Sequence, residues 1–573
     1  MNKELFGVFG GIETFEQHRA TGEFDEVVAG TSVTVGIRDS GLGTPGWSAS
    51  YAGENCLCVI WGEAYAPDGE SNVARWLVER YAVDGAAALS ELDGSYLVVL
   101  ECDGEALVAT DPIRSRECFY TDDPGVRVFG SDSAAVARTV DEPTLRRDAV
   151  LEFLHLGVTL GEKTSLEQLD RLPLDSYLTA RSVEPLERFV YDARQFDYVD
   201  ELATRLRRAL RRRSQLPGRK GLLLSAGYDS RTLLSEISEI ERCYTIGSTA
   251  AQEVQSAKRI ANQYGATHTA FPPDERYLLA DETKVRHSHG IKESLHVHHA
   301  GYTDEMDVDT MYHGLLCDTF FRGHFTAQDG IDVLGKRIPF ERLDPDPEPV
   351  DVLLERFGYD RDASAALAEK TSFDVDPDAF VRDAVRSAFG DALVRSDTIQ
   401  NAINCCGIAN QPSMPFHNHL ADNYFASFLV TDTELLDWHL TTPPEYRTTE
   451  TFLQACERLD DDLLRQRPPD RPHDSLLLNE VERFVRRKTP FLTSFEPPWP
   501  DRETLFDRYE LDRKLLADLD DVHDLPARHK LRLTDLLGWV DGWSGRGDRV
   551  SAWLLASGSP TVPSSANRRH LLE

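Results

Sequence analysis

The segment LLLSAGYDSR, residues 222–231, constrains the fold more than any other part of the chain. Its apolar start ends in a turn of small residues, and a helical pattern follows at once. Strand-like and helix-like segments then alternate through ERCYTIG and EVQSAKRIANQYG, within residues 241–265. This alternation predicts a parallel sheet covered by helices, in an α/β fold.

The turn in this segment has the composition of an anion site. Ser225 and Ser230 supply hydroxyl groups, Gly227 leaves backbone N–H groups accessible, and the helix N-terminus adds partial positive charge. A pyrophosphate group suits such a site, and Asp229 is placed to hold the Mg²⁺ that accompanies ATP. The same residues also suit an ordinary strand-to-helix turn, so the turn alone leaves both interpretations open.

The first part of the chain has a different pattern. VVAGTSVTVGI, CLCVIWGEAY and GSYLVVLEC are β-rich segments separated by Gly and Asp, and one helix is expected within residues 72–85. We expect stacked sheets over residues 1–195 and an α/β domain with a helical C-terminal part over residues 200–545. Residues 546–573 are expected to form a polar tail.

Charge restricts the classes of function. The 573 residues include 97 Asp and Glu against 62 Lys and Arg, and this net charge of −35 disfavours nucleic-acid binding. The acidic residues are spread along the whole chain and form no single tail. Such a balance is typical of halophilic proteins from salt-loving archaea, and we expect the same origin here.

Hydropathy and cysteine usage indicate the compartment. No run of about 18 apolar residues predicts a membrane span, and the start of the chain shows no signal-peptide pattern. The nine cysteines form no CxxC pair, so a zinc ribbon is not expected. We expect a cytoplasmic protein whose scattered thiols are reduced and mostly buried.

Four segments resemble motifs of the asparagine synthetase family of ATP-dependent ligases, in the family's order over roughly residues 200–500. SAGYDS resembles the pyrophosphatase loop SGGxDS, with Ala226 in place of a glycine. YHGLLCDTFFRGHF resembles GEGADELFGGY, QPSMPFHNHLADNYF resembles RVPFLDHRLVEF, and RFVRRKTPF resembles RxKxGF. Four motifs in order are far more specific than any one of them.

The resemblance implies a site for ATP and Mg²⁺ in which ATP is cleaved between its α- and β-phosphates. The nucleotide-binding positions that it implies are Leu223, Ser225, Gly227, Asp229, Ser230, Ile246 and Gly314. It assigns the metal to Asp229 and Asp318, and catalytic roles to Asp318 and Lys488. A lysine at this position can follow negative charge as it develops on the leaving pyrophosphate.

The N-terminal part resembles the glutaminase domain of the same family, an Ntn-hydrolase-like αββα sandwich. FGVFGG, WGEAY and residues 91–120 carry this resemblance. The family's nucleophile is an N-terminal cysteine, but Phe6 holds that position, and Trp61 replaces the expected oxyanion-binding Asn. Glu63 and Asp93 match positions that hold the charged groups of glutamine. We therefore expect an inactive, degenerate glutaminase site.

The function implied is an AMP-forming amide ligase that activates a carboxylate as an acyl-adenylate for attack by an amine or free ammonia. Leu315 and Thr319 replace two family glutamates, so the acceptor chemistry is expected to differ from aspartate plus ammonia. The relatives with a degenerate glutaminase, β-lactam synthetases and lasso-peptide cyclases, indicate a small-molecule or peptide substrate that carries both a carboxylate and an amine. No nucleic acid or membrane partner is expected, and a homodimer is left open.

Two alternatives to this function stay open. One is an asparagine synthetase-type enzyme of asparagine biosynthesis, using free ammonia. The other is a nucleotide-binding pseudoenzyme or scaffold, which Ala226, Leu315 and Thr319 favour. The intact Asp229 and Asp318 favour an enzyme.

Three further features have two interpretations each. Five histidines between His287 and His299 suit a metal site less well than substrate contact or packing, because no cysteine or acidic pair completes a ligand set. The arginine-rich segment 205–214 suits a solvated helix face better than an anion site. Arg231 is expected either beside the phosphates or in solvent.

Overall fold

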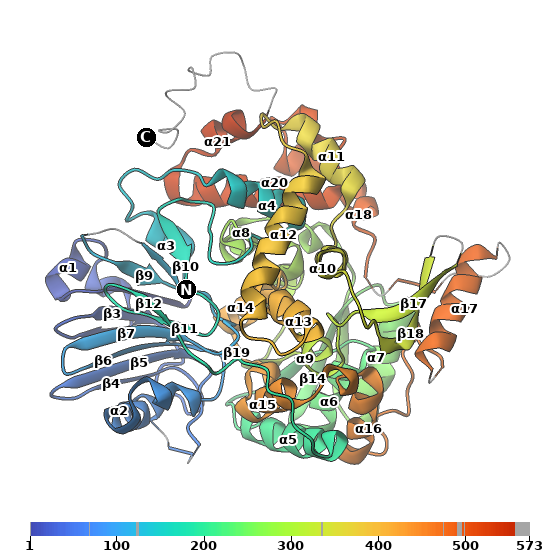
Figure 1. Cartoon of the computed structure of the whole chain (residues 1–573), viewed down its shortest axis with the longest axis horizontal. Helices are drawn as coiled ribbons and strands as arrows, with labels where there is room; N and C mark the ends of the chain where they lie inside the picture. The colour runs from blue at the N-terminus through green and yellow to red at the C-terminus, as the bar shows by residue number, and fades with distance from the viewer. Residues whose placement is uncertain are drawn as a thin grey trace.

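The computed structural model describes residues 2–67, 69–70, 72–121, 125–333, 336–473, 475–489, 495–497 and 499–555. Two antiparallel sheets form the N-terminal part, and a parallel sheet lies at the centre of the C-terminal part (Figure 1). The prediction of stacked sheets followed by a parallel-sheet α/β part is confirmed at this level.

Both N-terminal sheets have six strands, joined only by antiparallel pairs. The first sheet has the order β10 (Leu169–Arg171), β8 (Phe119–Thr121), β9 (Val128–Gly130), β1 (Glu4–Val8), β3 (Thr34–Arg38) and β2 (Glu26–Ala29). The second has the order β12 (Val183–Pro185), β11 (Ser176–Leu178), β7 (Glu105–Thr110), β6 (Tyr96–Cys102), β5 (Cys56–Gly62) and β4 (Ala49–Ala52).

Alternating side chains explain how the two sheets stack. Val35 and Ile37 of β3 meet Val59 of β5 and Val99 of β6 in one apolar cluster between the sheets. The opposite face of the second sheet packs on helix α2 (Val73–Asp84), the helix expected from the sequence. The result is a sandwich with helices on its outer faces (Figure 1).

The parallel sheet has the order β15 (Thr267–Phe271), β14 (Ile240–Ile246), β13 (Lys220–Leu223), β16 (Thr310–Tyr312) and β19 (Phe425–Ser427). All its pairs are parallel. The chain begins the sheet with β13 and adds β14 and then β15 on one side of it. It then adds β16 and β19 on the other side of β13. Ligands of open α/β sheets bind at the carboxyl ends of the strands flanking such a reversal.

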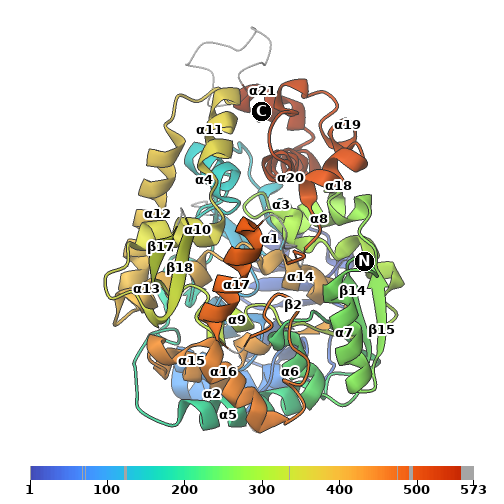
Figure 2. The same cartoon turned by 90° about the vertical axis from the view of Figure 1, so that its right-hand side faces the viewer.

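The other elements surround these sheets. The remaining helices are α1 (Ile12–Glu16), α3 (Ser133–Ala137), α4 (Arg147–Leu156), α5 (Tyr198–Arg213), α6 (Tyr228–Glu236), α7 (Gln252–Gln263), α8 (Glu282–Ser288), α9 (Cys317–Phe321), α10 (Pro349–Phe357), α11 (Arg361–Lys370), α12 (Pro377–Leu393), α13 (Ile399–Ala409), α14 (Met414–Asn423), α15 (Thr433–Thr441), α16 (Thr449–Leu459), α17 (Leu476–Lys488), α18 (Arg502–Arg508), α19 (Leu511–Leu515), α20 (Ala527–Ser544) and α21 (Gly547–Leu554). A hairpin of β17 (Gln328–Val333) and β18 (Lys336–Leu343) lies beside α17 (Figure 2).

The N-terminal and C-terminal parts share their apolar cores. Phe6 of β1 and Phe119 of β8 belong to one buried cluster with Leu420 of α14 and Trp539 of α20. The outer face of the first sheet therefore packs against C-terminal helices (Figure 1).

Two sequence expectations about the later chain differ from the structure. The mostly helical region expected there also contains the β17–β18 hairpin. The segment expected as a polar tail begins with helix α21, which buries Val550 and Leu554, and residues 556–573 lie outside the described part. Short strands and a single short helix have weak hydrophobic patterns in the sequence, because tertiary packing determines whether such segments form.

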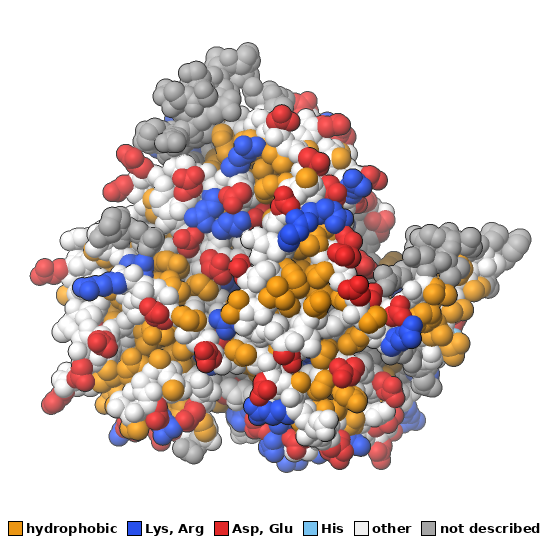
Figure 3. Space-filling model, in the orientation of Figure 1, with side chains coloured by type: hydrophobic (Ala, Val, Ile, Leu, Met, Phe, Trp, Pro, Cys, Tyr) orange, Lys and Arg blue, Asp and Glu red, His pale blue; other side chains and the backbone are white. Residues whose placement is uncertain are grey.

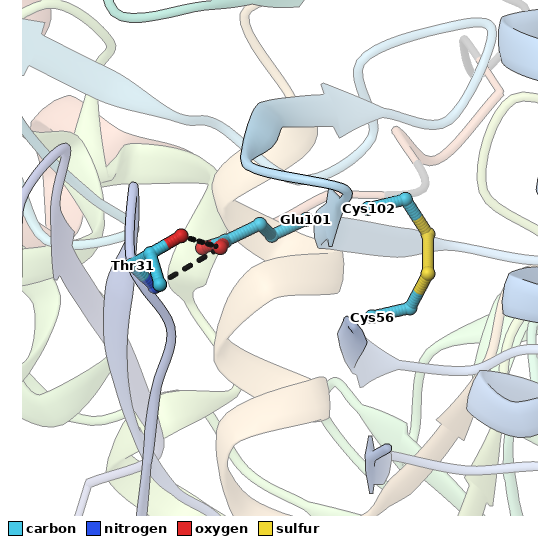
Figure 4. The surroundings of a disulfide bond; sticks show 4 residues. All are labelled: Thr31, Cys56, Glu101 and Cys102. Atoms are coloured by element: carbon cyan, nitrogen blue, oxygen red, sulfur yellow. Dashed lines mark hydrogen bonds between the residues drawn. A yellow bond between two sulfur atoms is a disulfide. The ribbon is translucent and has the colours of Figure 1, made fainter. Parts of the chain in front are cut away.

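The expectation that all the cysteines are reduced is wrong for one pair. Cys56 at the start of β5 and Cys102 at the end of β6 form a disulfide (Figure 4). They lie opposite each other in the antiparallel register, a pairing that only the fold reveals. The other seven cysteines are free and buried.

Acidic side chains are distributed over the face of the molecule shown in Figure 3, interspersed with Lys and Arg. This distribution leaves no large acidic patch on that face. Among the described residues, no helix is long and apolar enough to cross a membrane.

Candidate functional site

A cavity of roughly 570 Å³ opens at the carboxyl edge of the parallel sheet. The ends of β13 and β14 and the segment after β16 contribute to its walls. The cavity therefore lies at the reversal of strand order, where an open α/β sheet leaves a crevice between its loops.

Most of the residues implied as a nucleotide and metal site line this cavity. They are Leu223, Ser225, Asp229, Ser230, Ile246, Gly314 and Asp318. Gly227 is the N-cap of α6 in the same loop. Lys488 ends helix α17, but its side chain lies outside what the structure describes.

The loop after β13 is held by short side-chain contacts. Ser225 N donates to Ser230 Oγ at 3.2 Å, and Gly227 N donates to Ser225 Oγ at 3.1 Å. Ala226 N donates to the Glu253 carboxylate at 2.6 Å, so this amide already binds a negatively charged oxygen. The Ala226 N–H is a donor of the kind that binds a phosphate oxygen, and the Glu253 carboxyl oxygen occupies the position where that oxygen would bind.

Arg231 lies neither beside an open phosphate position nor in solvent. Its side chain is fully buried, and its Nε donates to Gly227 O at 2.9 Å. Its Nη2 donates to Ala226 O at 2.5 Å. The arginine therefore braces the loop from behind, an arrangement that sequence spacing does not reveal. Burial lowers the pKa of Arg231 to about 10.

Gly314 and Leu316 have special backbone requirements in the cavity wall that faces the loop after β13. A Cβ on Gly314 would lie 3.0 Å from Asp229 Cβ and from Ser230 N, so glycine allows the segment after β16 to approach α6. Leu316, the N-cap of α9, has a φ of 62°. A bulky residue in this left-handed region is strained, and such strain concentrates at functional sites.

The two aspartates differ in their surroundings. Asp229 accepts from Arg322 Nη1 at 2.9 and 3.0 Å. Burial raises the pKa of Asp229, Asp318 raises it further, and Arg322 opposes both. The Asp318 side chain is 43% exposed, and His324 Nδ1 lies 3.6 Å from its Oδ2.

These carboxylates are of the ligand type that a magnesium ion shared with phosphates would use. Mg²⁺ is usually held by one or two carboxylates with phosphate oxygens and water. Asp229 and Asp318 supply such a pair, and Arg322 would have to release Asp229 for the ion to bind it. No group of three His, Cys, Asp or Glu able to hold a metal is found among the described residues.

The histidine-rich segment is divided between the cavity and the core. His296, His298 and His299 line the cavity, whereas His287 and His289 line a smaller cavity near Trp61. His299 Nε2 lies 3.0 Å from His419 Nδ1. Leu315 and Thr319, the replacements for the family glutamates, also line the large cavity.

The expected glutaminase position is filled by packing. Phe6 is fully buried and makes an edge contact with Phe15 at 5.8 Å between ring centroids. Arg116 lies over the Trp61 ring at 4.3 Å, and the Trp61 indole N–H has no hydrogen-bond partner among the described residues.

Glu63 and Asp93 are bound by the C-terminal part of the chain. Glu63 accepts from Ser427 Oγ and Phe428 N, both at 2.9 Å. Asp93 accepts from Arg213 Nη2 at 3.0 Å, and Arg212 lies 2.9 Å away. Part of the arginine-rich segment is thus a buried clamp, whereas the sequence favoured a solvated face.

Several residues at the site were not anticipated from the sequence. Arg322 and Glu253 already bind the groups that a nucleotide and metal would contact. His313 and Phe416 also line the cavity. Arg322 and His313 both lie in the YHGLLCDTFFRGHF segment, within five residues of Asp318 in the sequence. This short separation was the only sequence feature that could have indicated them.

No protein-family model matches the chain, and no curated protein matches it. One similar solved structure is described as the allosteric regulatory enzyme of purine biosynthesis, with 12% identity over 48% of this chain and 82% of that chain, at a TM-score of 0.22. Another is glutamine phosphoribosylpyrophosphate amidotransferase from B. subtilis, with 11% identity over 48% and 77%, at a TM-score of 0.18. Scores this low carry no argument about this chain.

Proposed function

We propose that this protein is an ATP-dependent, AMP-forming amide ligase of the asparagine synthetase type. A substrate carboxylate attacks the α-phosphate of ATP, pyrophosphate leaves, and an amine or ammonia then attacks the acyl-adenylate. The observation that carries this proposal is that the serine loop, Asp229 and Asp318 line one cavity at the strand-order reversal.

The residues of the cavity have separate tasks in this reaction. The Ser225–Ser230 loop binds phosphate oxygens through its amide and hydroxyl groups. Asp229 and Asp318 hold Mg²⁺, which when bound neutralises phosphate charge. Lys488 stabilises the departing pyrophosphate. Leu223 and Ile246 supply an apolar surface for the adenine.

The N-terminal sandwich serves as a scaffold of Ntn-hydrolase type without glutaminase activity. Its Glu63 and Asp93 bind the C-terminal part of this chain, so the sandwich stabilises the ligase part. The amine therefore comes from the substrate or from solution.

The test is ATP–pyrophosphate exchange in molar KCl with a panel of carboxylic acids and amino acids. The proposal expects exchange that depends on one acid and on Mg²⁺, and that disappears in Asp318→Asn. Labelled phosphate exchange in place of pyrophosphate exchange would show a different cleavage of ATP and contradict the proposal.

A nucleotide-binding scaffold is the second candidate. The Asp229–Arg322 ion pair favours it, because a cation already occupies the expected metal ligand. This candidate expects ATP to raise the melting temperature although no acid supports exchange.

A further inference from the structure

A chain of five buried residues connects the large cavity with the interior of the N-terminal sandwich. Its members in order are His313, His417, Ser95, Ser115 and Asp111. His313 lines the cavity after β16, and His417 belongs to α14. Ser95 directly precedes β6, Asp111 directly follows β7, and Ser115 lies in the loop after β7. Each side chain is at most 1% exposed.

Every link in this chain is of hydrogen-bond length. His313 Nε2 lies 3.1 Å from His417 Nδ1, and His417 Nε2 lies 3.0 Å from Ser95 Oγ. Ser95 Oγ lies 2.7 Å from Ser115 Oγ. Ser115 Oγ donates to Asp111 Oδ2 at 2.6 Å.

The direction of the hydrogen bonds follows from the two ends. The backbone N–H of Leu315 can only donate, so His313 Nδ1 accepts at 3.3 Å and the ring proton lies on Nε2. His313 then donates to His417, and His417 donates to Ser95. At the far end the Asp111 carboxylate accepts, so each donor along the chain points away from the cavity.

We propose that this chain is a proton relay and that His313 is the general base that accepts a proton from the attacking amine. The inference rests on the proposed ligase function and supplies the group that Leu315, which replaces a family glutamate, cannot provide. The contact of Leu315 N with His313 Nδ1 is long for an N–H···N bond, so an incoming N–H can replace it.

The proton balance is complete without a further reactant. The amine nitrogen loses one proton to His313 Nδ1 as it forms the amide bond, and AMP leaves. The Nε2 proton of His313 moves to His417, whose own Nε2 proton moves to Ser95. The hydroxyl protons of Ser95 and Ser115 shift one place each, and Asp111 becomes a neutral carboxylic acid. When AMP has gone, the proton returns along the chain to water in the cavity.

The buried surroundings keep both histidines of the relay neutral at rest. Burial lowers the pKa of His313 to about 3 and holds that of His417 well below its usual value, with His313 and Arg116 adding to the effect on His417. Both rings therefore stay neutral and pass the proton on in a concerted step. Burial raises the pKa of Asp111, although hydrogen bonds from Ser115 and the charge of Arg188 oppose the shift, so this carboxylate accepts a proton more readily than an exposed aspartate does.

His313→Gln is the decisive variant, because an amide can keep both hydrogen bonds but cannot carry a proton onward. With an acid that supports exchange, amide formation from ammonium chloride should fall on the order of 100-fold relative to ATP–pyrophosphate exchange by the same variant. Hydroxylamine, which is uncharged at neutral pH, should restore product formation. The control is His155→Gln, which changes a buried histidine that is not part of this series of hydrogen bonds. It should behave as the native protein.

These partial reactions separate the relay from the ligase function. Absence of exchange in the native protein contradicts the ligase function, and the role of His313 as a base in that reaction is then refuted with it. Normal exchange with equal amide formation in the native protein and His313→Gln overturns the relay alone.

A measurement on the resting protein decides the relay whatever the substrate. In ¹⁵N-histidine spectra, His313 and His417 should both carry their proton on Nε2, and both should shift in Asp111→Asn while His155 does not. A proton on Nδ1 of His313, or an unchanged His313 signal in Asp111→Asn, would refute the relay.

Discussion

Arg213 of helix α5 donates to Asp93 of the N-terminal sandwich at 3.0 Å, and both side chains are buried. The same guanidinium also binds Asp432 at the start of α15. Asp93, which the sequence resemblance led us to expect at a substrate-binding position, binds a neighbouring part of its own chain.

The first prediction is that the purified protein releases no glutamate from glutamine above background. Phe6 provides no nucleophile, and Glu63 and Asp93 already have partners. Phe6→Cys should not restore hydrolysis, because residue 6 is fully buried and its position is not the chain's N-terminus. A coupled glutamate assay measures this, and glutamate production by the native protein would contradict it.

The second prediction concerns Arg213→Met. It removes the buried one of the two arginines that bind both Asp93 and Asp432, whereas the partly exposed Arg212 remains as their cation. The expected cost is therefore that of hydrogen bonds to charged groups, about 1.5–3 kcal/mol. Urea unfolding should show a loss of this size. The control is Arg208→Met on the same helix, whose half-exposed ion pair with Glu434 contributes about 0.2–1 kcal/mol. Equal losses of unfolding free energy in the two variants would mean that the buried ion pairs of Arg213 contribute no more than a surface ion pair.

The third prediction concerns pH and Asp535 of helix α20. This carboxyl is fully buried, accepts from Ser294 N at 2.7 Å, and has a pKa raised by burial from 3.8 to about 7. The folded protein therefore binds this proton more tightly than the unfolded chain. The stability from Asp535 is complete below about pH 4 and is lost as pH rises through about 7.

Asp535→Asn removes this loss and can keep the bond from Ser294. Its advantage in melting temperature should therefore grow between about pH 4 and pH 7 and stay constant above. The exposed Asp548→Asn is the control for simple removal of a surface charge. An advantage of Asp535→Asn that is the same at pH 5 and pH 8 would show that the carboxyl is ionised in the fold throughout.

The fourth prediction is that the protein is more stable in molar salt than in dilute buffer. The net charge of −35 causes self-repulsion, which screening weakens because the Debye length falls from about 10 Å at 0.1 M to about 3 Å at 1 M. The melting temperature should rise with KCl. Identical melting temperatures at both concentrations would reject a halophilic origin.

The fifth prediction concerns Lys488, at the end of α17. Lys488→Ala should slow pyrophosphate release on the order of 100-fold, about 3 kcal/mol, and leave nucleotide affinity largely unchanged. The serine loop and both aspartates remain in the variant. Lys370→Ala, at a surface ion pair with Asp524, is the control. Equal rates in native protein and Lys488→Ala, with the true substrate, would remove Lys488 from the site.

The elements around the main loop were largely predictable from local sequence. The expected strands and helices at residues 220–265 correspond to β13, α6, β14 and α7 within a few residues. Helix α2 was also expected, because its apolar residues recur at helical spacing. Local patterns suffice to predict a helix or strand when one of its faces is buried and its apolar residues recur at a regular spacing.

The partners of buried charges depend on contacts between distant segments. Asp93 and Arg213 are 120 residues apart, and Ser95 and His417 are 322 apart. The Cys56–Cys102 disulfide likewise depends on the register of β5 and β6. No local pattern encodes such pairs, because each residue alone is compatible with many neighbours.

Local side-chain patterns were enough to predict the order of strands and helices around the loop and the residue types that can bind phosphate and metal. Side-chain chemistry and hydrophobic period act over a few residues, so they can be read locally. Only the tertiary structure decided that Arg231 braces the loop, that Arg322 binds Asp229, and that His313 begins a buried chain. These contacts arise when packing excludes water, because each buried polar group must then find its partner within the fold.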